Sequence, residues 1–217
     1  IEKAMKIETI VVTGNIGSGK STVINTIKAA SQVKVEFFSF DDFTRELYNR
    51  EDVKAFLVAM FGTSDRKEIS DKVFAASRQM GKTEIAHVLR DSLNEYFFKF
   101  VEEKFLELVN RKNHQTLVIE FPMFFEMKQR SIPIQMARSK VKVITVACDE
   151  SLRLERVKNR DGFTEEKIAA IVASQLPQEF KVENADYVID TSNDHCETHI
   201  RDLMKVKFKR VFNHAVE

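Results

Sequence analysis

The stretch Gly14-Asn15-Ile16-Gly17-Ser18-Gly19-Lys20-Ser21 has the residue types and the spacing of a loop that binds a polyphosphate. It matches the pattern GxxxxGK[ST], in which glycines let the backbone turn so that successive N–H groups face phosphate oxygens. Lys20 would bring a positive charge to the β- and γ-phosphates, and the Ser21 hydroxyl would ligate Mg²⁺. A helical pattern begins near Lys20, so a helix N-terminus would strengthen anion binding. The sequence therefore predicts a nucleoside-triphosphate site.

Phosphoryl transfer would also need a group that accepts the proton of an attacking hydroxyl. Asp41 and Asp42 follow the second apolar run of the chain, where a carboxylate could do this. The same position suits a helix N-cap, and position alone does not decide between the two interpretations. Glu120 ends the third apolar run, where it would either belong to the outer shell of Mg²⁺ or only end a strand.

Cations that stabilise the transferred phosphate are the third requirement. Arg153, Arg156 and Arg160 have the spacing i, i+3, i+7, which places them on one face of a helix. Their guanidinium groups could close over a triphosphate as a lid, or they could form a solvated basic face. Gly162 follows them and favours a helix end or hinge.

Five short runs rich in β-branched and aromatic residues would position these groups. Such runs are typical of strands buried on both faces, and here they alternate with helical patterns. The alternation predicts an α/β fold with a five-stranded parallel sheet and right-handed crossovers. The runs cover residues 8–14, 33–40, 116–122, 141–147 and 185–191.

Two intervals are helical and too long for simple crossovers. Residues 43–115 predict a helical insertion, and residues 149–180 predict a second helical region. In the first, a stripe at helical spacing indicates a packing surface, formed by Leu93, Phe97, Val101, Phe105 and Leu108. We expect residues 1–217 to form a single domain that carries both regions.

Composition excludes several classes of partner. The 34 Lys and Arg residues balance 33 Asp and Glu residues, so the net charge of +1 gives no field that would attract nucleic acid or an anionic membrane. No apolar run approaches the roughly 18 residues that span a bilayer. Cys148 and Cys196 lack metal-ligand spacing, and the first residues resemble neither a signal peptide nor a transit peptide. We expect a cytoplasmic monomer or small homo-oligomer that binds neither nucleic acid nor membrane.

Over nearly its whole length the sequence resembles the dephospho-coenzyme A kinase family, phosphate-loop kinases related to the nucleoside monophosphate kinases. Six segments match in order and at compatible spacing: "VVTGNIGSGKST", "SFDDFTREL", "SDRKEISDKVF", "LVIEFPMFFE", "RVKNRDGFTEEKIAAIVASQ" and "ENADYVIDTSND". The resemblance implies the three-layer fold of P-loop NTPases. It also implies that residues 43–115 grip the acceptor and that residues 149–180 form the lid.

The resemblance implies transfer of the γ-phosphoryl group of ATP, with Mg²⁺, to the ribose 3′-hydroxyl of dephospho-coenzyme A. Asp41 aligns with the catalytic base of the family, and Arg160 aligns with the lid arginine that contacts the transferred phosphate. Arg66 and His87 would contact the acceptor. The remaining nucleotide contacts would come from Asn15, Ile16, Gly17, Ser18, Gly19, Lys20, Ser21, Thr22, Arg156 and, at the adenine, the loop with Asn193.

Three departures from the family pattern concern nucleotide or acceptor contacts. Ser39 replaces an Asp, Val88 follows His87 where Pro is expected, and Thr191 stands where Asn begins the closing loop. The altered segment at His87 and Val88 motivates one alternative, a (deoxy)nucleoside monophosphate kinase of the same fold. A second alternative, from another class, is a non-catalytic nucleotide-binding switch protein. The candidate base and the cationic lid favour an enzyme over a switch.

Overall fold

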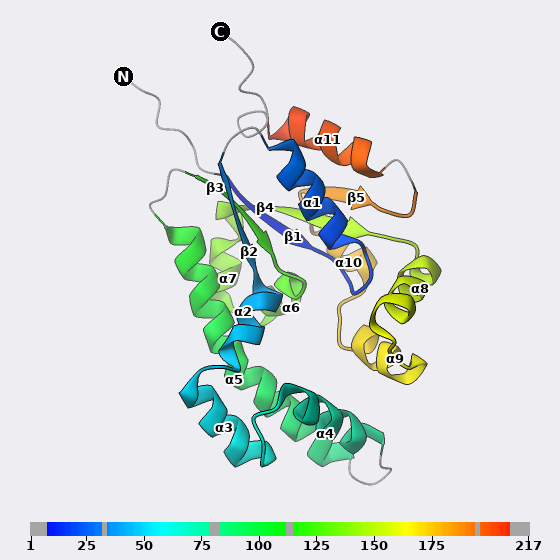
Figure 1. Cartoon of the computed structure of the whole chain (residues 1–217). Helices are drawn as coiled ribbons and strands as arrows, with labels where there is room; N and C mark the ends of the chain where they lie inside the picture. The colour runs from blue at the N-terminus through cyan, green and yellow to red at the C-terminus, as the bar shows by residue number, and fades with distance from the viewer. Residues whose placement is uncertain (1–7, 32–33, 79–82, 112–114, 194–195, 209–217) are drawn as a thin grey trace. The chain divides into compact units, whose positions relative to one another are not determined.

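A computed structural model of the chain describes residues 8–31, 34–78, 83–111, 115–193 and 196–208. Its strands form one parallel sheet in the order β2-β3-β1-β4-β5, with β1 at the centre (Figure 1). Each strand falls within one of the five predicted runs, so the predicted five-stranded parallel sheet is confirmed. The strands are β1 (Thr9–Thr13), β2 (Val35–Ser39), β3 (Thr116–Glu120), β4 (Val141–Ala147) and β5 (Tyr187–Asp190).

Burial differs between the inner and the outer strands. All five residues of β1 are buried, whereas all five residues of β2 are only partly buried. The expectation that every strand is buried on both faces is therefore wrong for β2. β2 is an edge strand, so a neighbouring strand covers only one of its two sides.

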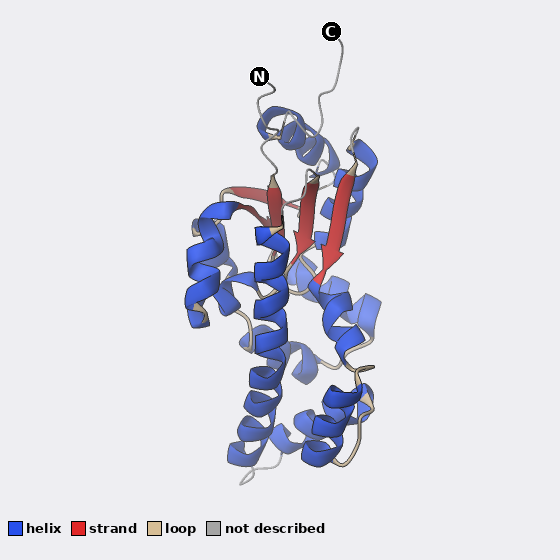
Figure 2. Cartoon of the chain, turned by 90° about the vertical axis from the view of Figure 1, so that its left-hand side faces the viewer, coloured by secondary structure: helices blue, strands red, loops and turns tan. Residues whose placement is uncertain are grey.

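Helices lie on both sides of the strands (Figure 2). On one face, α1 (Lys20–Ala30) and α11 (Cys196–Lys207) share a core with alternate strand residues such as Ile10, Val12 and Ile144. Thr145 points to the opposite face, because side chains alternate along a strand. There it donates a hydrogen bond to the carbonyl of Lys181 in α10 (Gln178–Glu183). Helices α6 (Phe124–Arg130) and α7 (Ile132–Ala137) also lie on this side (Figure 1).

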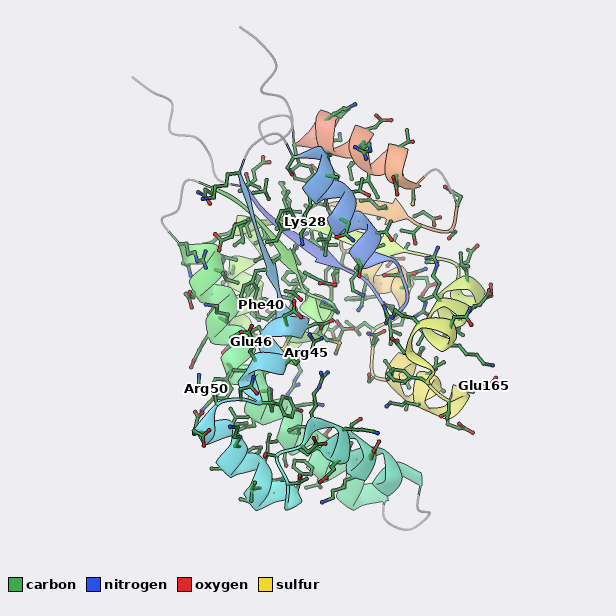
Figure 3. The ribbon with its side chains drawn as sticks, in the orientation of Figure 1. Lys28, Phe40, Arg45, Glu46, Arg50 and Glu165 are labelled. Atoms are coloured by element: carbon green, nitrogen blue, oxygen red, sulfur yellow. The ribbon has the colours of Figure 1, made fainter. Side chains whose placement is uncertain are left out.

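Residues 40–105 form a compact unit of their own, here called the helical unit; the remainder, with the sheet, is the sheet unit. The helical unit contains α2 (Phe40–Leu47), α3 (Glu51–Phe61), α4 (Arg66–Arg78) and most of α5 (Thr83–Asn110). Phe40, Arg45 and Glu46 lie on α2 (Figure 3). The helical unit has a core of its own, which consists of Leu47, Val53, Leu57, Phe61, Ile69 and Phe97.

The apolar stripe predicted on α5 is a packing surface. Phe97, Val101, Phe105 and Leu108 are buried, and Leu93 packs against the core of the helical unit. Among the described helices, none is both long enough and apolar enough to cross a bilayer.

The predicted helical region 149–180 contains α8 (Glu150–Asp161) and α9 (Glu165–Ala173). Gly162 ends α8 with a φ of 61°, and its N–H donates to the carbonyl of Lys158. This agrees with the predicted helix end, because glycine adopts the left-handed conformation without steric cost.

Candidate functional site

Neighbouring segments approach the loop between β1 and α1 closely at two of its glycines. Gly17 has a φ of 77°, and a Cβ there would overlap the Arg153 carbonyl and the Val157 side chain. At Gly19, with a φ of 87°, a Cβ would lie 3.0 Å from Thr191 Oγ1. Glycine is therefore required where neighbouring segments approach the loop closely.

The start of α1 has the features of an anion-binding site. Its N-cap is Gly19, which has no side chain to cap the helix. The first N–H groups of an α-helix have no intrahelical partner, so they are available to an anion. Lys20 Nζ lies 3.0 Å from the Gly14 carbonyl oxygen and 3.1 Å from that of Asn15, which keeps the ammonium group at the loop. Ser21 and Thr22 follow in the first turn with exposed side chains. These residues fit a bound polyphosphate.

The candidate Mg²⁺ ligands have the chemistry that this ion needs. Glu120 ends β3 and pairs in register with Val12 on one side and Ser39 on the other, so it stands at the edge where β1 leads into the loop. Within the described residues no group of three or more His, Cys, Asp or Glu could hold a metal ion. A hydroxyl from Ser21 and one carboxylate suit Mg²⁺, which usually takes its other ligands from water and substrate phosphates.

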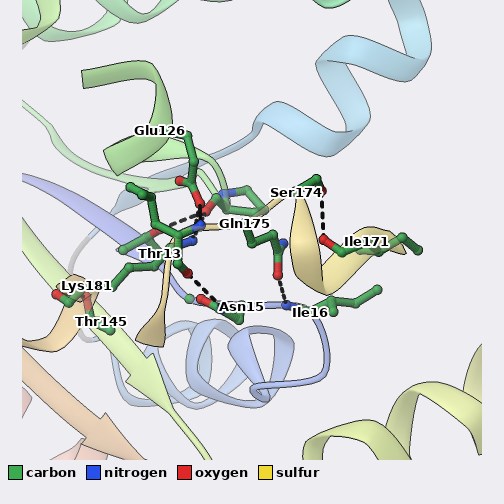
Figure 4. A network of polar contacts seen from close by, with 12 residues as sticks. Thr13, Asn15, Ile16, Glu126, Thr145, Ile171, Ser174, Gln175 and Lys181 are labelled. Carbon is green, nitrogen blue, oxygen red and sulfur yellow. Dashed lines mark hydrogen bonds and ion pairs between the residues drawn. The ribbon is translucent and has the colours of Figure 1, made fainter. Parts of the chain in front are cut away.

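The outer side of the phosphate loop is attached to the turn at Gln175 and Leu176. Asn15 Nδ2 donates to the Leu176 carbonyl at 3.1 Å, and the Ile16 N–H donates to Gln175 Oε1 at 3.0 Å (Figure 4). Asn15 is buried. The loop conformation therefore depends on a segment about 160 residues further along the chain.

The predicted arginine face of α8 has three different environments. Arg153 is 5% exposed, and its Nη1 lies 3.4 Å from the Ile16 carbonyl oxygen. Arg156 donates to Thr191 Oγ1 at 3.0 Å and to the Thr191 carbonyl at 2.9 Å. Arg160 is 62% exposed and forms a bidentate pair with Asp161, which lowers the pKa of that carboxyl group. The solvated-face interpretation is therefore wrong for Arg153, which is buried against the loop.

Thr191 joins the end of the sheet to the phosphate loop. It is buried, and its hydroxyl donates to the Ser18 carbonyl at 2.7 Å. Beyond it, hydrogen bonds from the Ser192 side chain and from the Ser192 N–H lower the pKa of Asp190. Asn193, predicted at the adenine, is exposed in the same loop. The predicted adenine loop thus lies beside the predicted phosphate loop.

The helical unit contains the two candidate aspartates. Both lie inside the first turn of α2, after Phe40, so the N-cap interpretation is wrong. Asp42 pairs with Arg45 at 2.8 Å, and both side chains are exposed. Asp41 is also exposed and lies two residues beyond Ser39, the end of β2.

The predicted acceptor residues belong to the same unit. Arg66 is the first residue of α4, and its guanidinium lies 6.0 Å from the centre of the Tyr48 ring. Burial raises the pKa of Tyr48, and the charge of Arg66 opposes this shift. His87 lies in α5, but its side chain falls outside the described part of the molecule.

Sequence reasoning missed the contacts that support the loop. Glu126 is the last residue of the quoted segment "LVIEFPMFFE", and Gln175 is the last residue of "RVKNRDGFTEEKIAAIVASQ". The sequence did not show which residues these two side chains contact, so it indicated no role for them. In the structure Glu126 Oε1 accepts from the Leu176 N–H at 2.8 Å and lies 2.8 Å from Lys181 Nζ. Lys181 had no signal in the sequence, since a lysine in a helical pattern is usually exposed.

Comparison with known proteins identifies relatives over most of the chain. A family model described as dephospho-CoA kinase matches residues 8–197. The dephospho-CoA kinase of Nitrobacter winogradskyi is 33% identical over 208 residues, which cover 91% of this chain and 94% of that protein. The dephospho-CoA kinase of Rhizobium meliloti is 31% identical over 187 residues, which cover 83% of this chain and 87% of that protein.

Two solved structures have a similar fold. The dephospho-CoA kinase from Campylobacter jejuni has a TM-score of 0.55 and 21% identity, covering 94% of this chain and 96% of that one. A shikimate kinase from Acinetobacter baumannii has a TM-score of 0.50 and 13% identity, covering 96% of this chain and 97% of that one.

Proposed function

The chain belongs to the dephospho-CoA kinase family, and on that premise we propose that it transfers the γ-phosphoryl group of ATP to the ribose 3′-hydroxyl of dephospho-coenzyme A. This reaction is the last step of coenzyme A biosynthesis. The observation that carries the proposal is the family match over residues 8–197, which includes both the phosphate loop and the whole helical unit.

The phosphate loop would hold the triphosphate. Apart from the N–H of Ile16, which donates to Gln175, the backbone N–H groups of residues 15–20 and the Lys20 ammonium would bind the β- and γ-phosphates, and Thr22 would reach the α-phosphate. Ser21 and Glu120 would hold Mg²⁺, which would neutralise charge on the phosphates when bound. The adenine would lie against the loop that follows β5, at Asn193.

Asp41 would orient the acceptor hydroxyl and take its proton as the new O–P bond forms. Arg160, with Arg156, would stabilise the negative charge of the transferred group. Because Arg160 pairs with Asp161, it would exchange that carboxylate for a phosphate as the lid closes. Arg66 and His87 would bind the phosphate-rich part of the acceptor, and closure would exclude water.

A coupled ADP-release assay tests the acceptor. We expect turnover with Mg·ATP and dephospho-coenzyme A, and much slower turnover with deoxynucleoside and nucleoside monophosphates. Turnover with a monophosphate but none with dephospho-coenzyme A would favour a nucleotide kinase. Nucleotide binding without turnover on any acceptor would favour a switch protein.

A further inference from the structure

A buried ion pair lies close to the phosphate loop and has no part in the proposed chemistry. Lys181 in α10 is fully buried, and its Nζ lies 2.8 Å from Glu126 Oε1 in α6, whose side chain is 13% exposed. Burial lowers the pKa of Lys181, and the carboxylate of Glu126 opposes this shift. Buried ion pairs often add little net stability, because removing both charges from water costs about as much as their attraction returns. Stability alone therefore does not account for this pair.

One arm of the pair leads to the start of the phosphate loop. Lys181 Nζ donates to the Pro122 carbonyl at 3.2 Å. The same oxygen accepts a hydrogen bond from Thr13 Oγ1 at 3.0 Å. Thr13 is the last residue of β1, so the ammonium group reaches the loop entrance through a single shared carbonyl.

The other arm leads to the outer side of the loop. Glu126 Oε1 accepts the Leu176 N–H at 2.8 Å, and the Leu176 carbonyl accepts from Asn15 Nδ2 at 3.1 Å. The neighbouring Gln175 holds the Ile16 N–H. Both arms belong to the sheet unit and meet on either side of Gly14, so they close a ring of polar contacts around the loop entrance (Figure 4).

The charge of Glu126 strengthens this ring. An ionised acceptor forms shorter and stronger hydrogen bonds than a neutral one, so the carboxylate holds the Leu176 N–H firmly. The glycines allow the loop many backbone conformations, and binding of a triphosphate needs one of them. The turn at residues 175–176 contacts the loop at Asn15 and Ile16, so it can hold the loop in that one conformation.

We propose that Glu126 and Lys181 are positioning residues for the phosphate loop: the pair fixes the turn at residues 175–176, which holds Asn15 and Ile16 in the conformation that binds the triphosphate. The inference rests on the proposed ATP site and is independent of the acceptor.

Two double variants separate this role from a structural one. Lys181→Met with Glu126→Gln and Lys181→Met with Glu126→Met both remove the two charges, but only Gln can accept the Leu176 N–H. Because one buried hydrogen bond distinguishes them, we expect the Kd for Mg·ATP, measured by titration calorimetry on the full chain, to be about tenfold higher for the Met variant. The KM for dephospho-coenzyme A should agree within about twofold, since this bond positions only the nucleotide loop.

A second ion pair provides a matched control for stability. Asp186 Oδ2 accepts from the Val143 N–H at 2.7 Å and lies 3.0 Å from Arg138 Nη2, so this carboxylate, like that of Glu126, contacts both a backbone N–H and a cation; it lies toward the amino ends of the strands, away from the phosphate loop. Asp186→Asn should lower the melting temperature and leave the Kd for Mg·ATP within about twofold of the wild type, because a contact remote from the loop does not act on it.

If the double variants do not fold, the same question can be asked at the partly exposed Gln175. Gln175→Met removes the acceptor of the Ile16 N–H and should raise the Kd for Mg·ATP by roughly fivefold or more, the worth of one hydrogen bond. Ser174→Ala is its control, because Ser174 Oγ contacts only the Ile171 carbonyl at 2.7 Å among the hydrogen bonds described.

Wild-type affinity for Mg·ATP in the double variant that carries Glu126→Met, or in Gln175→Met, would overturn the positioning role while leaving the proposed function intact. A wild-type protein that binds Mg·ATP but does not phosphorylate dephospho-coenzyme A would contradict the proposed acceptor and leave the positioning role standing. A wild-type protein that binds no nucleotide would overturn both.

Discussion

At the scale of single residues, the adjacent Asp41 and Asp42 differ in their proposed roles. Asp42 is held by Arg45 at 2.8 Å, on the exposed side of α2. Asp41 is exposed in the same turn and is the residue that aligns with the base of the family. The pair therefore provides an internal comparison, because both changes to Asn remove one negative charge from the same helical turn.

We predict that Asp41→Asn lowers kcat by roughly 10²–10⁴-fold, the usual worth of a positioned proton acceptor. The Kd for Mg·ATP should stay close to the wild-type value, because Asp41 is proposed to act on the acceptor. Steady-state kinetics with dephospho-coenzyme A and a separate ATP titration measure the two effects. Asp42→Asn is the control and should change kcat only a few-fold. Equal losses in the two variants would remove Asp41 from the mechanism.

At the scale of elements, α8 lies directly against the phosphate loop. The Arg153 carbonyl and the Val157 side chain occupy the space that a Cβ on Gly17 would need. Helix and loop are therefore in direct contact at this point. Arg156, one turn beyond Arg153, ties the same helix to Thr191, which in turn contacts the loop at Ser18.

We predict that Gly17→Ala abolishes detectable Mg·ATP binding, because the methyl group must displace either α8 or the loop. Gly62→Ala isolates the cost of the backbone conformation: Gly62 has a similar φ of 73°, and no atom lies within 4 Å of its added Cβ. That control should lose only about 1–2 kcal/mol of stability, the cost of a left-handed L-residue. Calorimetric ATP titration and thermal melting measure both variants. If Gly17→Ala bound ATP at wild-type affinity, α8 could move away from the loop without weakening nucleotide binding.

At the scale of the whole molecule, two compact units have separate cores. Leu57 is fully buried among residues of the helical unit, and Ile200 is fully buried in the cluster that joins α1 and α11 to the sheet. The phosphate loop belongs to the sheet unit, whereas Asp41 and Arg66 belong to the helical unit. Loss of one core should therefore affect the two substrates differently.

We predict that Leu57→Ala destabilises the helical unit by roughly 2–5 kcal/mol, the usual cost of a cavity at a buried leucine. Turnover of dephospho-coenzyme A should fall more than affinity for Mg·ATP. Ile200→Ala should reverse the order and weaken ATP binding first. Hydrogen exchange resolved by segment, together with ATP titration, measures both effects. Parallel loss of both properties in both variants would mean that the units unfold as one.

The sequence by itself determined the features that depend on local chemistry. Glycines at the spacing of Gly14, Gly17 and Gly19 permit few purposes other than a tight anion loop, and runs of β-branched residues between helical patterns permit few folds other than a parallel α/β sheet. The end of α8 at Gly162 was predictable for the same reason, because one residue type suits that backbone conformation.

Only the tertiary structure decided which distant groups meet. Arg153, Arg156 and Arg160 are equivalent by spacing, yet one is buried under the loop, one is tied to Thr191 and one lies at the surface. Lys181 and Glu126 become a pair only when α10 and α6 fold onto the same face of the sheet. The spacing of residues along a helix indicates which side chains face inward. It does not indicate which residues they contact, because those contacts depend on packing between segments far apart in the chain.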